Sequence, residues 1–294
     1  MTNEVLVAWL VQAESSDTDR ATLENFFNSV TSRPFDPVVL DFINVLSDKL
    51  LSTCKNNFPD LVALAYWCRE KHIKKIHDDF FDAFQHRIIR PKGTVFQLAP
   101  GNVDTLFIYS GLLSLLMGNR TVIRISQQRS EQLNFLLSVL RELLQKDTFI
   151  PLAQRFFVFT CDHESDWLQM ISQGCDMRVI WGGNESVSAI RQIPLSPSAK
   201  DVSFADRSSL CLINAEAVCR ISDLKSDSSS DELHKLLSDF GRDVLTYSQQ
   251  ACSSPKAIIW QGTTENVARA QAFFWRAFER WALEESTSGN AIAA

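Results

Sequence analysis

The chain has 294 residues, 45% of them hydrophobic and 22% charged, which is the ordinary range for a globular protein of one large or two smaller domains. A formal net charge of −6 argues against a nucleic acid as partner, because nucleic-acid-binding surfaces are basic. The longest apolar stretch, residues 106–117, is too short to cross a bilayer. The seven scattered cysteines form no C-x-x-C pair and the chain starts without a signal peptide, so we expect a cytoplasmic protein with reduced thiols and no metal site.

The first ninety residues are predicted to form a helical N-terminal region, residues 1–90. Apolar residues recur at helical spacing over residues 37–51, 61–67 and 76–84. The short basic cluster at residues 71–75 is interleaved with a histidine and is interpreted as a solvated helix face.

After residue 90 the pattern changes to strands that alternate with helices. The predicted strands are 94–98, 121–125, 156–159 and 177–181. The predicted helices that follow them are 105–117, 130–144, 165–173 and 185–190. Alternation at this length predicts an α/β domain over residues 91–221, built on a parallel sheet with helices on both faces.

The remaining residues are predicted to form a second, shorter α/β segment. A serine-rich stretch at 222–231 is predicted to be an exposed loop or a domain boundary. A helix over 231–245 and an apolar strand at 257–260 then indicate a further domain over residues 231–285. The last residues lose all periodicity, and 286–294 are predicted to be a disordered tail.

Cys252 is the most informative cysteine because it falls at the junction between that helix and that strand. A junction exposes a side chain on a rigid base, which suits a covalent nucleophile. Flanking polar residues could donate hydrogen bonds to a thiolate or to an oxyanion formed beside it; these are Gln249, Gln250, Ser253 and Ser254. A half-buried structural cysteine beside a polar turn is the alternative that these residues leave open.

Two further turns carry groups suited to binding. Asn102 follows a strand in Pro-Gly-Asn, and its amide could hold an oxyanion, although these residues also suit a plain turn. Gly182 and Gly183 follow another strand and open a helix, whose amino-terminal amides suit a phosphate. The full G-x-G-x-x-G spacing is missing, so this turn alone is a weak dinucleotide motif.

The order of four short segments is more specific than any one of them. Pro-Gly-Asn at 100–102 is followed by Gly-Asn-Arg-Thr-Val-Ile-Arg-Ile-Ser at 118–126, Trp-Gly-Gly at 181–183 and Gln-Ala-Cys-Ser-Ser-Pro at 250–255. With these segments, residues 93–260 resemble the aldehyde dehydrogenase superfamily and, more closely, its acyl-CoA reductase (LuxC) branch. The resemblance implies an aldehyde-dehydrogenase-like, Rossmann-type sheet, with the nucleotide bound by 91–221 and a catalytic domain that starts at 231–285.

The same resemblance implies a role for each matching residue. Cys252 would attack an acyl thioester to form an acyl-enzyme, and Asn102 would stabilise the oxyanion. The implied cofactor-binding positions are Arg124, Ser126, Arg129, Gly182 and Gly183. The implied reaction is the NAD(P)H-dependent reduction of a long-chain acyl-CoA or acyl thioester to the aldehyde. An acyl-protein synthetase and a second copy of the chain are the partners that it implies.

The cofactor is expected to be NADPH, or NADH. No acid follows Arg124 in Ile-Ser-Gln-Gln-Arg at 125–129 to repel a 2′-phosphate, and Arg124 and Arg129 offer positive charge to one. The alternative is that Arg129 is a solvated residue at a helix start and that Arg124 binds a ribose hydroxyl.

The chain departs from the superfamily pattern in two places. Residues 204–209 stand where many aldehyde dehydrogenases have Glu-Leu-Gly-Gly-Lys with the general base, so no base is assigned, and Asp206 and Glu216 are candidates that also suit surface acids. The chain also ends soon after Cys252, where the resemblance implies more of the catalytic domain, so we expect a carboxyl-terminal truncation. The alternatives are therefore a non-catalytic relative that binds nucleotide or an acyl-transfer partner, and an oxidative aldehyde dehydrogenase.

Overall fold

The computed structural model divides the chain into two compact units, the N-terminal unit Met1–Ala205 and the C-terminal unit Asp206–Ala294. It describes residues 11–12, 17–54, 57–100, 105–128, 130–162, 165–223, 227–245, 249 and 252–287. The division falls after Ala205, earlier than the serine-rich stretch 222–231 where the sequence analysis expected a boundary. The physical reason is that residues 209–214 form a strand whose pairing partner lies after Cys252, in the C-terminal unit.

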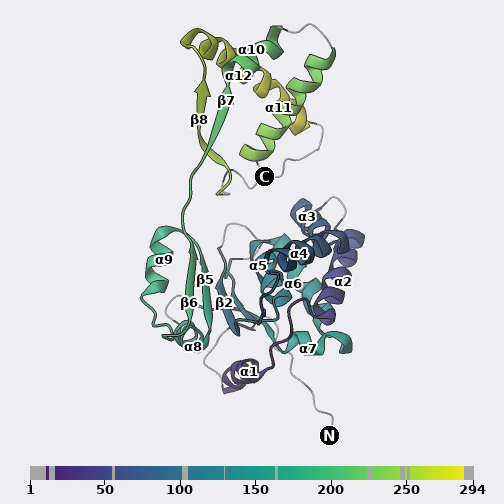
Figure 1. Ribbon diagram of the computed structural model, residues 1–294, viewed down its shortest axis with the longest axis vertical. Coiled ribbons are helices and arrows are strands. Elements are labelled where there is room, and N and C mark those ends of the chain that lie inside the picture. Colours follow the sequence, from purple (N-terminus) through teal and green to yellow (C-terminus); the bar gives the residue numbers. More distant parts are fainter. Residues whose placement is uncertain are drawn as a thin grey trace. The chain divides into compact units, whose positions relative to one another are not determined.

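A six-stranded sheet forms the centre of the N-terminal unit. Its strands are β1 (Val11–Gln12), β2 (Thr94–Leu98), β3 (Arg120–Arg124), β4 (Phe156–Thr160), β5 (Met177–Trp181) and β6 (Lys200–Phe204). They lie in the order β1-β4-β3-β2-β5-β6 and every pair is parallel. Of these strands, β2, β5 and β6 are labelled in Figure 1. β2 and β4 are buried over their full length, as apolar strands covered on both faces are. The predicted parallel sheet is confirmed, and β1 and β6 are edge strands that the sequence analysis did not predict.

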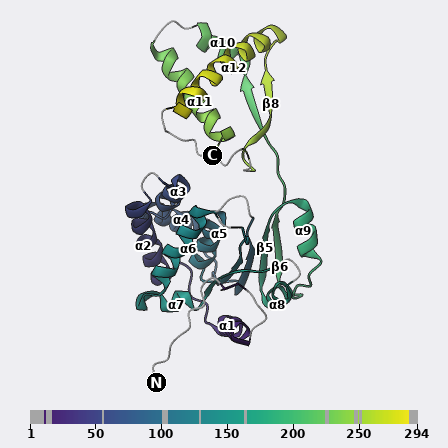
Figure 2. The same ribbon diagram turned by 180° about the vertical axis from the view of Figure 1, so that it is seen from behind.

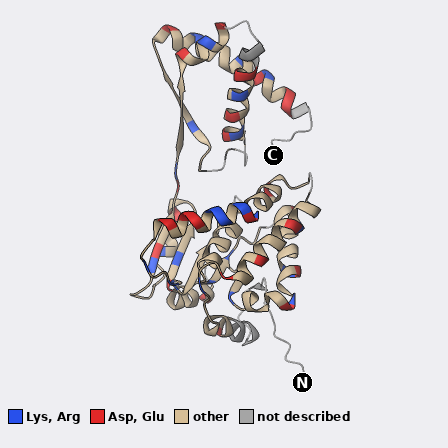
Figure 3. Cartoon of the chain, turned by 45° about the vertical axis from the view of Figure 1, so that its right-hand side comes forward, with Lys and Arg blue, Asp and Glu red and all other residues tan. Residues whose placement is uncertain are grey.

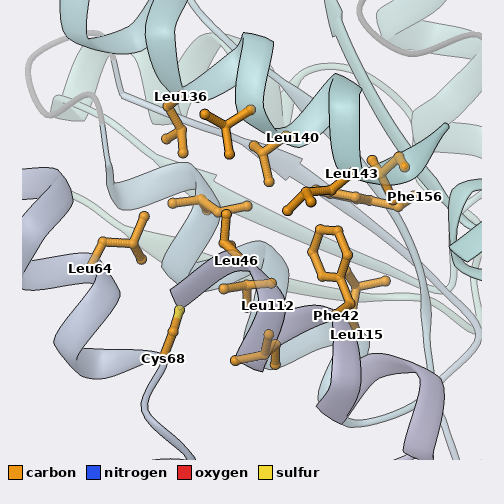
Figure 4. Packing of buried hydrophobic residues seen from close by; sticks show 14 of the residues in the cluster. Phe42, Leu46, Leu64, Cys68, Leu112, Leu115, Leu136, Leu140, Leu143 and Phe156 are labelled. Atoms are coloured by element: carbon orange, nitrogen blue, oxygen red, sulfur yellow. The ribbon is translucent and has the colours of Figure 1, made fainter. Parts of the chain in front are cut away.

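Helices cover both faces of this sheet (Figure 2). They are α1 (Asp17–Asn28), α2 (Pro37–Thr53), α3 (Pro59–Trp67), α4 (Glu70–Ala83), α5 (Leu106–Leu116), α6 (Glu131–Leu144), the short η1 (Asp147–Phe149), α7 (Ile150–Ala153), α8 (Asp166–Gly174) and α9 (Asn184–Arg191). Successive residues of a strand point to opposite faces. Ile123 therefore packs with the cluster from α2 to α7, which includes Phe42 and Leu140 (Figure 4), whereas Val122 packs with the cluster from α1, α8 and α9.

The first ninety residues contain the helices α1 to α4, in line with the mostly helical pattern of the sequence, and one strand of two residues; they belong to the same compact unit as the sheet. β1 pairs with β4 at one edge of the sheet, and α1 packs on the face opposite to α2, α3 and α4. A strand of two residues leaves no alternating pattern in a sequence, so its register with β4 could not be foreseen.

The basic cluster at 71–75 lies on α4, as predicted. Lys71, Lys74 and Lys75 are exposed, while Ile73 is buried against the core. Figure 3 shows how basic and acidic residues are distributed along the chain. Lys75 pairs with Asp79 one turn later, with 2.6 Å between Nζ and Oδ2. The cluster is thus a solvated helix face.

In its described residues, the C-terminal unit has two parallel strands and three α-helices. The elements are β7 (Ser209–Asn214), α10 (Ala215–Asp223), α11 (Asp227–Leu245), β8 (Pro255–Gln261) and α12 (Thr264–Thr287). Phe240, Phe274 and Trp281 of its helices form a buried core with Ile213 of β7. α11 begins at Asp227 and α12 continues to Thr287, so residues 227–231 and 286–287 are helical where a loop and a tail were expected; residues 224–226 and 288–294 lie outside the described residues. No described helix is both long and apolar enough to span a membrane.

Candidate active site

The carboxyl ends of the central strands bring several of the predicted residues to one edge of the sheet. β3 and β4 follow β2 on one side of it, whereas β5 and β6 lie on its other side, so the strand order reverses between β2 and β5 (Figure 1). Open parallel sheets bind nucleotides at this switch point. Arg124 ends β3, and Gly182 and Gly183 directly follow β5. Asn102, four residues after the end of β2, and Arg129, five residues after the end of β3, lie outside the described residues.

The turn after β5 leads from two glycines into the amino terminus of α9. The Gly182 amide donates to the carbonyl of Phe204 at 3.2 Å, and Gly183 is the N-cap of α9 without a side-chain cap hydrogen bond. The ring of Trp181 stacks on that of Phe204, with 3.8 Å between centroids, which holds the ends of β5 and β6 together. A helix amino terminus next to glycine backbone suits a phosphate.

Arg124 reaches from the end of β3 to the end of β4. Its Nη2 donates to the carbonyl of Cys161 at 3.2 Å, and its buried Nε has no hydrogen-bond partner among the described residues. Ser126 accepts a hydrogen bond at Oγ from the Gln128 amide, at 3.2 Å. The guanidinium is therefore held by the residue that follows β4, and its buried Nε is left without a partner among the described residues.

Asp162 is a further polar residue at the carboxyl edge of the sheet, and the sequence analysis did not single it out. The carboxylate of Asp162, just after β4, accepts a hydrogen bond from Gln127 Nε2 at 2.8 Å. Both side chains are exposed, and they lie at the same edge of the sheet as Arg124. The signal available in the sequence was the position of Asp162, two residues beyond a buried strand that pairs in parallel with β3.

Cys252 lies in the turn that leads into β8, at the junction where the sequence analysis placed it. It is the only exposed cysteine of the seven, all of which belong to the described residues. Burial raises the pKa of Cys54, Cys161 and Cys211, and it raises that of Cys68 to about 12 and that of Cys175 to about 11. A thiol must be accessible to act as a nucleophile, so Cys252 is the candidate that the structure favours.

The backbone around Cys252 is fixed by hydrogen bonds from both strands. Ser209 Oγ on β7 donates to the carbonyl of Cys252 at 2.7 Å, and Lys256 Nζ on β8 donates to the carbonyl of Gln249 at 2.7 Å. Gln249 has a φ of +63°, in the left-handed region that costs a non-glycine residue energy and that is frequent at functional sites. The carbonyls of Gln249 and Cys252 are thus each tied to a strand of this unit.

The polar neighbours of Cys252 differ in exposure. Ser253 is exposed, whereas Ser254 is 1% exposed and its hydroxyl has no hydrogen-bond partner among the described residues. Gln250 lies outside the described residues. A buried hydroxyl without a partner costs free energy, so its presence two residues from the thiol marks a group that could serve a ligand.

The structure assigns no general base. Glu216 is exposed in the first turn of α10, where an acid is favoured by the helix dipole, and Asp206 is exposed after β6. Among the described residues, no group of three or more His, Cys, Asp or Glu side chains could hold a metal ion.

Comparison with known proteins shows similarity in sequence to one family. A family model described as acyl-CoA reductase (LuxC) matches residues 65–273. The long-chain acyl-protein thioester reductase of Photorhabdus luminescens is 27% identical over 176 residues, which are 59% of this chain and 33% of that protein. The reductase of the same name from Aliivibrio fischeri is 24% identical over 176 residues, with shares of 59% and 33%. The chain spans about one third of the length of these curated relatives.

Solved structures of aldehyde dehydrogenases share the fold. Glyceraldehyde-3-phosphate dehydrogenase of Methanocaldococcus jannaschii, complexed with NADP, has a TM-score of 0.57 at 12% identity and covers 90% of this chain and 59% of its own. The NADP-dependent enzyme from Bacillus halodurans has a TM-score of 0.55 at 16% identity, with shares of 89% and 55%. The expected aldehyde-dehydrogenase-like α/β fold is thus confirmed.

Proposed function

Because the chain belongs to the acyl-CoA reductase (LuxC) family, we propose that it reduces a long-chain acyl-CoA or acyl thioester to the aldehyde through an acyl group on Cys252. The observation that carries this proposal is the accessibility of one thiol. Cys252 is exposed in a turn that hydrogen bonds from both strands hold in place, and the other six cysteines are buried or half-buried. A nucleophile needs both accessibility and a fixed backbone.

The hydride donor is proposed to be NADPH or NADH, bound at the carboxyl edge of the six-stranded sheet. The reversal of strand order between β2 and β5, the Gly182–Gly183 turn at the start of α9 and the guanidinium of Arg124 fit a dinucleotide. Ser126 and Arg129 belong to the same proposed site. Two dehydrogenases that share the fold are described as an NADP complex and as NADP-dependent, which supports this choice. When bound, the dinucleotide would supply one hydride to the acyl carbon.

The chemistry of the chain's own residues follows from the thiolate. Cys252 Sγ forms a bond to the carbonyl carbon, the carbonyl oxygen takes the negative charge, and the bond to the departing thiol breaks, which leaves an acyl-cysteine. Asn102 is proposed as a donor to that oxyanion, and Ser253 or Ser254 as a neighbouring donor. After reduction, the oxyanion of the hemithioacetal re-forms the carbonyl and expels Cys252 as thiolate, and the aldehyde leaves. No water is consumed, so the reaction requires no general base to activate one.

The acyl donor is proposed to be acyl-CoA or an acyl group carried on a partner protein. The curated relatives are named long-chain acyl-protein thioester reductases, and this name supports a donor on a protein, as an acyl-protein synthetase would present it. Their names also support a long acyl chain. A homo-oligomer is a further proposal that rests on the family alone.

Mass spectrometry of the intact chain after mixing with hexadecanoyl-CoA tests the proposal. We expect an added acyl mass on the peptide that contains Cys252, which NADPH then discharges as hexadecanal. Cys252→Ser should abolish the adduct, and Cys211→Ser, at a half-buried position in the same unit, should retain it. An adduct that NADPH and NADH both fail to discharge would favour the second candidate, a relative that binds an acyl-transfer partner without turnover. Acylation of a different cysteine would refute the assignment of Cys252.

A further inference from the structure

The carboxylate of Asp162 lies at the carboxyl edge of the six-stranded sheet, where the nucleotide is proposed to bind. The residues that directly follow Arg124 include no acid. In the parallel pairing of β3 with β4, Arg124 lies opposite Phe159, and the Ile125 amide donates to the Phe159 carbonyl at 2.9 Å. Gln127 follows Arg124 by three residues, and Asp162 likewise follows Phe159 by three. Gln127 Nε2 donates a hydrogen bond to Asp162 Oδ1 at 2.8 Å. The register between β3 and β4 thus brings the carboxylate of Asp162 next to Gln127, the amide residue that follows β3.

The two charged groups at this edge act in opposite directions on a phosphate. The Arg124 guanidinium is held at the carbonyl of Cys161, the residue directly before Asp162, so the positive and the negative side chain are anchored within two residues of β4. A guanidinium attracts a 2′-phosphate, whereas a carboxylate repels it and accepts hydrogen bonds from ribose hydroxyls. The hydrogen bond from Gln127 restrains the carboxylate without neutralising it, because an amide carries no charge.

We propose that Asp162 is a specificity-determining residue for the nucleotide, which lowers the affinity for NADPH relative to NADH. This inference rests on the proposed function, since it assumes a dinucleotide at this edge. The Arg124 guanidinium raises the affinity for NADPH relative to NADH, and the Asp162 carboxylate after β4 lowers it. Arg124 and Asp162 together set the ratio of the two affinities.

The matched variants are Asp162→Asn and Asp147→Asn. Asparagine keeps an oxygen that can accept the hydrogen bond from Gln127 and removes only the charge. Asp147 is exposed in η1, which precedes β4 and therefore lies towards the opposite, amino-terminal edge of the sheet, so its replacement removes the same charge away from the site. For a doubly charged phosphate a few ångströms from one carboxylate in water, loss of the carboxylate corresponds to about a tenfold gain in affinity at low salt.

Fluorescence titration of the intact chain with NADPH and with NADH measures both dissociation constants. We expect Asp162→Asn to raise the affinity ratio of NADPH to NADH about tenfold at low ionic strength and less at high salt, and Asp147→Asn to leave the ratio unchanged. An unchanged ratio in Asp162→Asn, with both nucleotides still bound, would overturn this inference and leave the proposed function standing. A wild-type chain that binds neither nucleotide would overturn the nucleotide site and the inference together.

Discussion

The seven cysteines of this chain should react with iodoacetamide at very different rates, and Cys252 should react first. The thiolate is the reactive species, so rate follows the thiolate fraction and the access of the reagent. Burial raises the pKa of Cys68 to about 12 and that of Cys175 to about 11. At pH 7 these values correspond to about one thiolate in 10⁵ and one in 10⁴ molecules, against about 3% for a thiol of ordinary pKa.

The difference in thiolate fraction alone is therefore about 300-fold for Cys175 and about 3,000-fold for Cys68, relative to an ordinary exposed thiol. Restricted access to the buried sulfurs adds to it. Between pH 7 and pH 8 the labelling of Cys68 should rise about tenfold, because both pH values lie below its raised pKa. Hexadecanoyl-CoA added first should protect the thiol that reacts fastest, if that thiol is the one acylated.

Peptide mapping by mass spectrometry over a time course measures these rates. Cys252→Ser should remove the fast phase and leave the slow ones unchanged, and labelling in concentrated urea should make the seven sites equivalent. Labelling of Cys68 or Cys175 in the folded chain at the rate of Cys252 would refute the reasoning, because it would mean that burial does not protect them.

Three further predictions concern single side chains. Arg124→Met should weaken NADPH more than NADH, about tenfold at low salt, in a fluorescence titration; an equal loss for both would mean that Arg124 contacts only groups they share. Ser254→Ala should leave the free energy of unfolding in urea unchanged or raise it by up to about 1 kcal/mol, since the buried hydroxyl has no described partner; a loss of that size would reveal one. Asp201→Ala should lower the free energy of unfolding by about 1–3 kcal/mol, because it leaves the buried guanidinium of Arg178 without its carboxylate 2.7 Å away, whereas an unchanged urea midpoint would show that the pair is not stabilising.

The sequence predicts the central strands well and the edge strands poorly. β2 to β5 are short apolar runs between turn residues, and burial on both faces is what makes such runs apolar. β6 reads Lys-Asp-Val-Ser-Phe, and its polar residues are tolerated because an edge strand is less buried. β7 also contains a short apolar run, Leu-Cys-Leu-Ile, which the sequence analysis left unassigned, and its Leu210 and Leu212 are exposed.

The residues of the candidate site also differ in how well the sequence predicts them, because some are local features and others depend on contacts between strands. The glycine turn after β5 and the junction around Cys252 could be predicted because each is a local feature: glycines after a strand, or a thiol between a helix and a strand. Asp162 could not be found this way, because its meeting with Gln127 depends on the register between β3 and β4. A periodic pattern shows which residues form a strand and which face is buried, but it carries no information on which residue of the neighbouring strand lies opposite. An acid supplied by a neighbouring strand is therefore invisible to a search for an acid after Arg124, and expectations of NADP selectivity drawn from one strand are incomplete wherever a second strand ends at the same edge.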